Sequence, residues 1–412
     1  MMEPVRCPSR DSPDANAACA QHPTSPMYPS KRQITLADIP LGEPLPFSIY
    51  DVEGRVLLRK GVVVSMIEQV ESLILRKAVM GTTTPPAAPS AAQRAGAPMR
   101  AAPEASPVYE QVGSLILNLK HSYATALKTP DQIDLPSRIM QFAARLQALC
   151  TTDTDSTLAA PHLDYVNPYL IVHQVMGAVL TELIARRQGL GEEQRLIFVC
   201  AALTRGIGLA AVQGEIEQCD GPLPEALKKA VHAHPLQSGA ILRRAGVTDD
   251  CWLDSVEHYH ERLDGSGYPQ RIAGQSIGLG ARMLAIADTY SAMTKPRPYR
   301  GKAWVTQTAL RDIYLQKDAG LDGELIQNMI REIGIFPPGS IVRLKSGELA
   351  VIKQRTHKAA DAVAYTVYDQ RGMPLLEPMR RETSNPAYEI VGMVPFTDCR
   401  AAAVTIKRLW LK

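Results

Sequence analysis

The feature that most constrains the fold is a change in the spacing of apolar residues along the chain. Between about residues 164 and 335, apolar side chains recur every three or four positions, as in Val172, Val175 and Val179. A period near 3.6 is typical of helices. After residues 336–339, which read Phe-Pro-Pro-Gly, the period changes to two, as in short strands. We therefore predict a mainly α protein with a small C-terminal antiparallel β-domain.

Composition shifts divide the rest of the chain. Residues 1–33 are rich in Pro, Ser, Ala and Asp without periodicity, which predicts a disordered tail. Residues 34–81 predict a small N-terminal α/β or β-hairpin domain, with two strands around a turn at 52–54 and a helix at 65–79. Residues 82–107 form an Ala- and Pro-rich linker. The helical domain then covers 108–335 and the β-domain 336–412. Two helices, at 108–123 and 137–150, are expected to pack on the core rather than mediate dimerisation.

Charge and cysteine content limit the environment of the chain. The net charge of +3 over 412 residues is too mild to indicate nucleic-acid binding. The seven cysteines include no CxxC pair, which favours free thiols in a reducing compartment. Neither an apolar run of about 18 residues nor a secretory h-region is present. We expect a cytoplasmic protein without membrane insertion.

The densest cluster of reactive side chains lies at residues 258–269, which read HYHERLDGSGYP. Helical spacing of the preceding apolar residues predicts that a helix carries both His258 and His260. Asp264 to Pro269 then break that helix into a tight loop. Histidine and carboxylate groups at a helix end can bind a divalent metal, and loop N–H groups can approach a phosphate. The plainer alternative is a solvated helix end followed by a surface turn.

The string resembles HHExxDGxGYP, the signature of the HD-GYP family of metal-dependent phosphohydrolases, except that Tyr259 replaces the first histidine. The resemblance covers roughly residues 164–335 and implies an HD-type helical bundle. It also implies cyclic di-GMP or a related nucleotide as ligand. Diguanylate-cyclase (GGDEF) domain proteins are implied as partners, through Gly267, Tyr268 and Pro269.

The family holds its metals with histidines and aspartates gathered from several helices. Four matching residues remain here, His173, His234, His260 and Asp288. The HD pair itself, normally within ALLHDIGK, is lost, because residues 202–209 read ALTRGIGL. Arg205 replaces the histidine and Gly206 the bridging aspartate. The four remaining residues could hold one tetrahedral Fe or Mn ion, or they are buried core groups joined by hydrogen bonds.

Arginine at the former metal position suggests anion binding without water activation. Arg205 is expected at the centre of the site, and Arg297 and Arg300 are three apart, so a helical turn would place both on one side. With Tyr268, these arginines are the expected nucleotide-binding residues. Alternatively, Arg205 pairs with Asp288 or Glu261 and fills the vacant site.

No residue is assigned a catalytic role. The sequence predicts a catalytically impaired HD-GYP protein of cyclic di-GMP signalling, acting as a nucleotide-binding or partner-binding regulator. Two alternatives stay open at this point. One is an active phosphodiesterase with an altered mononuclear site, and the other is a pure protein-interaction scaffold.

Overall fold

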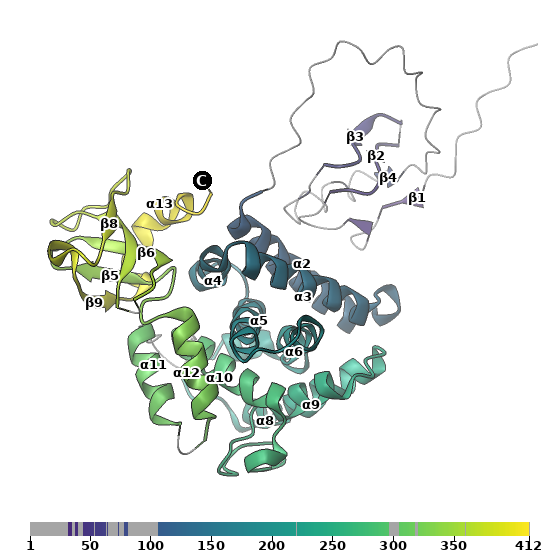
Figure 1. The fold of residues 1–412 in the computed structure, drawn as a ribbon. Helices are drawn as coiled ribbons and strands as arrows, with labels where there is room; N and C mark the ends of the chain where they lie inside the picture. The colour runs from purple at the N-terminus through teal and green to yellow at the C-terminus, as the bar shows by residue number, and fades with distance from the viewer. Residues whose placement is uncertain are drawn as a thin grey trace, which may run out of the picture.

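A bundle of helices forms the main body of the computed structural model (Figure 1). The structure describes residues 32–34, 38–39, 44–52, 54–62, 64, 73, 78–80, 106–219, 221–295, 305–317, 320–358 and 360–411. The helices of the bundle, in chain order, are α2 (Val108–Lys128), α3 (Leu135–Thr152), α4 (Thr154–Leu163), α5 (Tyr169–Arg187), α6 (Glu192–Thr204), α7 (Gln213–Glu217), α8 (Glu225–Arg244), α9 (Asp250–His258), α10 (Leu279–Thr294), α11 (Thr306–Leu315) and α12 (Gly323–Ile333). The predicted mainly α fold is confirmed.

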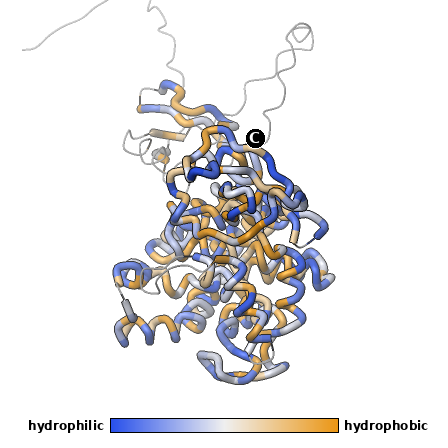
Figure 2. The backbone as a smooth tube through the Cα atoms, turned by 90° about the vertical axis from the view of Figure 1, so that its left-hand side faces the viewer, coloured by the Kyte–Doolittle hydropathy of each residue, from blue (hydrophilic) through white to orange (hydrophobic). Residues whose placement is uncertain are grey.

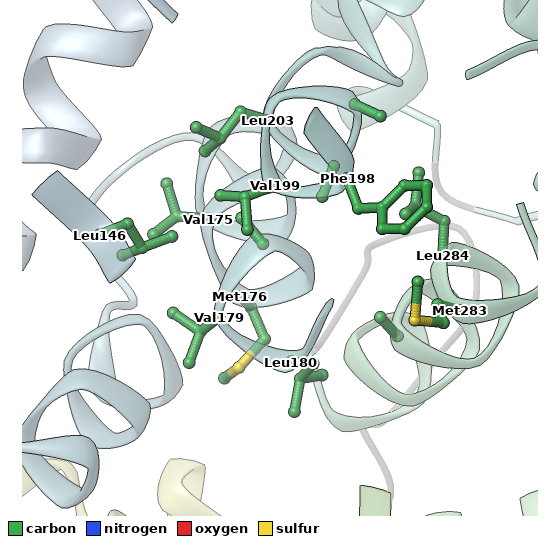
Figure 3. Close-up of a cluster of buried hydrophobic side chains, with 14 of the residues drawn as sticks. Leu146, Val175, Met176, Val179, Leu180, Phe198, Val199, Leu203, Met283 and Leu284 are labelled. Carbon is green, nitrogen blue, oxygen red and sulfur yellow. The ribbon is translucent and has the colours of Figure 1, made fainter. Parts of the chain in front are cut away.

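Helix α5 lies at the centre of this bundle. Every residue from Leu170 to Ala185 is buried, on all faces of the helix, as expected for a helix that other elements surround. Figure 3 draws part of the buried cluster around it, with Met176 of α5 on one side and Phe198 of α6 beside Leu284 of α10 on the other. The cluster also includes residues of α2 and α3. These two helices therefore pack on the core, as predicted.

Helix α8 corrects the prediction that Pro235 separates a helix at 223–234 from another at 236–245. One helix runs from Glu225 to Arg244 with Pro235 inside it. Proline has no N–H to donate to the carbonyl four residues earlier, and that usually breaks a helix. Here the Val231 carbonyl accepts a hydrogen bond from Nδ1 of His234 instead, at 2.5 Å. The side chain thus satisfies the acceptor that the proline leaves open.

Helix α9 ends earlier than predicted. It begins at its cap Asp249, whose side chain accepts from the Trp252 N–H, and stops at His258. His260 therefore lies in the turn after the helix and not on it. The reason is the tight turn in which the Glu261 N–H donates to the His258 carbonyl at 2.8 Å.

The C-terminal domain is the predicted small antiparallel sheet. Its strands pair in the order β8-β7-β6-β5-β9, with β5 (Ile341–Leu344), β6 (Leu349–Arg355), β7 (Ala362–Tyr368), β8 (Arg380–Glu382) and β9 (Ile390–Val394). A short helix that the sequence analysis missed, α13 (Ala403–Arg408), follows the sheet. Ile406 and Trp410 pack with Ala159 and Leu163 of α4, which joins this domain to the bundle.

The N-terminal strands β2 (Ile49–Tyr50) and β3 (Val56–Leu58) form the predicted antiparallel hairpin. They share a sheet with β1 (Arg32–Gln33) and β4 (Val79–Met80), in the order β1-β4-β2-β3. Strand β1 lies inside the segment predicted to be a disordered tail, and β4 begins where the predicted helix was to end. Both corrections arise because strand pairing depends on distant partners. The linker at 82–107 and most of the tail and helix predictions fall outside the described residues.

Hydrophobic stretches gather towards the middle of the helical bundle, and hydrophilic stretches lie on its outer turns (Figure 2). Among the described residues, none of the helices combines the length and apolar character needed to cross a membrane.

Candidate functional site

The structure brings the four predicted metal ligands and Arg205 together from five segments of the bundle. His173 comes from α5, Arg205 follows α6, His234 lies on α8 and Asp288 on α10. His260 follows α9, and its ring centroid is 5.2 Å from that of His234. Arg297 and Arg300, the other predicted nucleotide-binding arginines, lie outside the described residues.

The Arg205 guanidinium occupies the interior of this cluster. The residue is 1% exposed. Its Nε donates to Asp288 Oδ1 at 3.2 Å, and its two terminal nitrogens donate to the Ala202 carbonyl at 2.6 Å and the His173 carbonyl at 3.0 Å. The guanidinium carbon also lies 5.7 Å from the centroid of the Tyr259 ring. The predicted alternative, in which Arg205 pairs with Asp288 and fills the site, describes this geometry.

Two glycines make room for this arrangement. A Cβ added at Gly177 of α5 would lie 2.6 Å from both terminal nitrogens of Arg205. A Cβ added at Gly206 would lie 2.2 Å from Nε2 of Gln174. Gln174 is itself buried. The space next to residue 206, where the family carries its bridging carboxylate, is therefore filled by an amide.

His173 and Asp288 form a buried pair beside the guanidinium. His173 Nε2 lies 2.8 Å from Asp288 Oδ1, and its Nδ1 lies 2.6 Å from Ser291 Oγ. Burial alone would raise the pKa of Asp288. His173, His260 and Arg205 outweigh that effect and hold the pKa well below its usual range. Asp288 is thus an ionised carboxylate that is already compensated by protein groups.

Another predicted ligand, His234, is hydrogen-bonded to Tyr259, the residue that stands where the family signature has a histidine. Nδ1 of His234 donates to the Val231 carbonyl, because a carbonyl can only accept. Nε2 of the neutral ring must then be a hydrogen-bond acceptor, and the Tyr259 hydroxyl donates to it at 2.5 Å. Burial lowers the pKa of His234 to about 4, so the ring is neutral at pH 7.

The Gly-Tyr-Pro loop is fixed to the bundle by contacts that the sequence analysis did not foresee. The ring of Tyr268 lies between His260 and His232 of α8, with centroids 4.5 and 4.4 Å away. Glu261 Oε1 accepts from the backbone N–H groups of Gln270 at 2.6 Å and Arg271 at 3.1 Å. Tyr268 thus stacks on two histidine rings from different segments. Spacing could not have identified His232, which belongs to a different helix from the loop.

These residues do not fit a metal ion. Both nitrogens of His173 and of His234 are engaged, and Asp288 Oδ1 is shared by His173 and Arg205. Across the ranges that the structure describes, no group of three or more His, Cys, Asp or Glu residues is arranged to hold a metal. The permanently charged guanidinium would also repel a cation placed beside it.

Comparison with known proteins gives the class of the helical domain. A family model described as HD domain matches residues 157–325. A cyclic di-GMP phosphodiesterase of Pseudomonas aeruginosa is 31% identical over 49% of this chain and 48% of its own length. A 3′3′-cGAMP-specific phosphodiesterase of Vibrio cholerae is 31% identical over 42% of this chain and 38% of its own length. Among solved structures, an HDG"Y"P protein from Bdellovibrio bacteriovorus matches with a TM-score of 0.47 and 11% identity, over 73% of this chain and 98% of its own.

Residues 157–325 thus form an HD domain. More narrowly, this domain is similar in sequence to cyclic dinucleotide phosphodiesterases. HD-type phosphohydrolases are metal-dependent enzymes. The matched regions span about half or less of the length of these curated relatives.

Proposed function

We propose that this HD domain is a regulatory module of cyclic dinucleotide signalling that has lost hydrolytic activity. The observation that carries the proposal is the buried guanidinium of Arg205, bonded to Asp288 at the position where the family signature has a histidine ligand.

Hydrolysis by metal-dependent phosphohydrolases requires a metal-bound water whose pKa is lowered towards neutrality. A guanidinium carries a single positive charge and cannot act as a Lewis acid on a water molecule, and it stays protonated, so it cannot act as a base. The other candidate ligands are held in hydrogen bonds within the protein. These features favour a domain without hydrolytic activity over a phosphodiesterase that keeps one metal.

The geometry favours partner binding over nucleotide binding in the core. Each nitrogen of the Arg205 side chain already donates to a protein acceptor, so the fork is not free for a phosphate. The Tyr268 ring already stacks on His260 and His232, which competes with stacking on a base. The rigid loop at Gly267, Tyr268 and Pro269 is instead a suitable docking element, and GGDEF-domain proteins are the partners that the family resemblance suggests. We expect the module to act in the cytoplasm, where its free cysteines stay reduced.

A hydrolysis and metal assay tests the proposal. The purified full chain, supplied with Mn²⁺ or Fe²⁺, is incubated with cyclic di-GMP and with 3′3′-cGAMP beside the active Pseudomonas relative. We expect no turnover above background and at most one tightly bound metal per chain after dialysis against a chelator. Turnover near that of the relative would show that the domain is an enzyme, and two metals per chain would contradict the proposed loss of the metal site.

A further inference from the structure

We infer that Arg205 is a built-in cation that takes the structural place of a metal ion, so that this HD domain is held together without one. Three helices meet at the guanidinium. It binds the carbonyl of Ala202 near the end of α6, the carbonyl of His173 in α5 and the carboxylate of Asp288 in α10. The contacts with His173 and Asp288 join the end of α6 to α5 and α10, as a shared metal would, and the contact with Ala202 holds the side chain against its own helix.

The charge balance of the site supports a cation in this position. A buried carboxylate without a compensating charge is strongly unfavourable, and the same holds for a buried guanidinium. Asp288 and Arg205 compensate each other, and the two carbonyls each accept one N–H from a terminal nitrogen of the fork. Removing the guanidinium would leave the Asp288 carboxylate with His173 as its one hydrogen-bond partner among the described side chains.

The surroundings are shaped for a planar fork and not for a spherical ion. Gly177 leaves the volume that the terminal nitrogens occupy, and any larger side chain would displace them. Gln174 fills the volume beside Gly206. Tyr259 covers Nε2 of His234 and places its ring near the guanidinium. Five residues on four segments are thus shaped to hold an arginine side chain at the centre: Gln174, Gly177, Gly206, His234 and Tyr259.

This inference concerns what stabilises the domain and does not depend on the proposed function. A domain that stays folded in the presence of chelators could still bind a partner or fail to bind one. Stability and hydrolysis are also measured in separate experiments. The two conclusions can therefore fail independently.

The first test measures thermal unfolding of the full-length wild type with EDTA, without additive, and with Mn²⁺, Fe²⁺ or Zn²⁺. We expect the same Tm within about 1 °C in all conditions, because ligands that bind only the native state would raise it. A saturable rise of several degrees with one metal, or a fall with EDTA, would overturn the inference.

The second test displaces the guanidinium without removing it. Gly177→Ala places a Cβ against the terminal nitrogens of Arg205, whereas Gly113→Ala on α2 places one where nothing lies within 4 Å. Alanine is the better helix former, so the control should keep or raise the Tm. We expect Gly177→Ala to lower the Tm by about 5 °C or more. Equal Tm values for the two variants would contradict a central role for the fork.

A double-mutant cycle then assigns the effect to the charge pair. Arg205→Met and Asp288→Asn are each expected to lower the Tm, and the double variant should lose less than the two shifts added together. Additive losses would mean that the pair is not coupled. If Arg205→Met does not fold, the wild-type and Gly177→Ala measurements still decide the question.

Discussion

At the scale of single residues, position 206 limits any attempt to restore a metal site. Replacing Gly206 alone with aspartate would drive its Cβ into Gln174, whose Nε2 would lie 2.2 Å away, and against Leu170 at 3.0 Å. The missing carboxylate is therefore not a simple vacancy. The buried side chain of Gln174 fills the volume that the carboxylate would need.

This steric conflict yields a prediction about metal binding. The triple variant Arg205→His, Gly206→Asp, Tyr259→His restores every lost ligand of the family pattern but should bind no more metal than the wild type. Adding Gln174→Ala should allow at least one metal per chain to survive dialysis, because the aspartate side chain then has space. Metal content of the two variants is measured by elemental analysis. Stoichiometric metal in the triple variant would show that Gln174 moves aside.

At the scale of elements, the Gly-Tyr-Pro loop depends on one close approach of backbone to backbone. A Cβ at Gly267 would lie 2.4 Å from the Cα of Glu261. The Tyr268 N–H donates to the His260 carbonyl at 3.2 Å, and the Glu261 carboxylate holds the far side of the loop. The loop is thus a part of the fold, and its shape is set by residues 259–261.

We predict that Gly267→Ala loosens the loop. Tryptic cleavage after Arg271, which is exposed, should become about tenfold faster, because each 1.4 kcal/mol of lost local stability raises the open population tenfold. Gly214→Ala is the matched control, since nothing lies within 4 Å of its added Cβ. Cleavage is followed by mass spectrometry under native conditions. An unchanged rate in Gly267→Ala would mean that the loop tolerates the added methyl group.

At the scale of the whole molecule, the C-terminal domain is attached through the cluster around Trp410. This residue is 2% exposed, and its ring stacks on Tyr109 of α2 with a centroid distance of 6.0 Å. The Lys353 ammonium lies 3.9 Å from the same ring. A second contact joins Tyr165, in the bundle, to Phe396 with centroids 4.3 Å apart. The sheet and the helices therefore share buried aromatic surface.

Loss of that surface should be measurable in the full chain. Trp410→Ala is expected to lower the free energy of unfolding of the C-terminal domain by about 3–5 kcal/mol, as for other large-to-small changes in a core. Val404→Ala on the neighbouring helix α13, where the side chain is 66% exposed, should change it by less than about 0.5 kcal/mol. Urea unfolding followed by circular dichroism makes the comparison. Similar values for both variants would argue against a shared core.

Local patterns were sufficient for most of the helices and for the antiparallel C-terminal sheet, and the family resemblance of residues 202–209 was sufficient for the position of Arg205. Apolar periodicity reports which face of each helix or strand is buried, and the Ile207-Gly208 register carries Arg205 into the site. Tertiary structure alone decided which way that arginine points. Its acceptors, at residues 173, 202 and 288, lie far apart in the chain, except for the carbonyl of its own helix. The same reason explains the continuity of α8 through Pro235, because the bond that replaces the lost one comes from a side chain held by Tyr259. Hydrogen bonds between distant segments leave no period in the sequence, so their geometry appears only when the chain is folded.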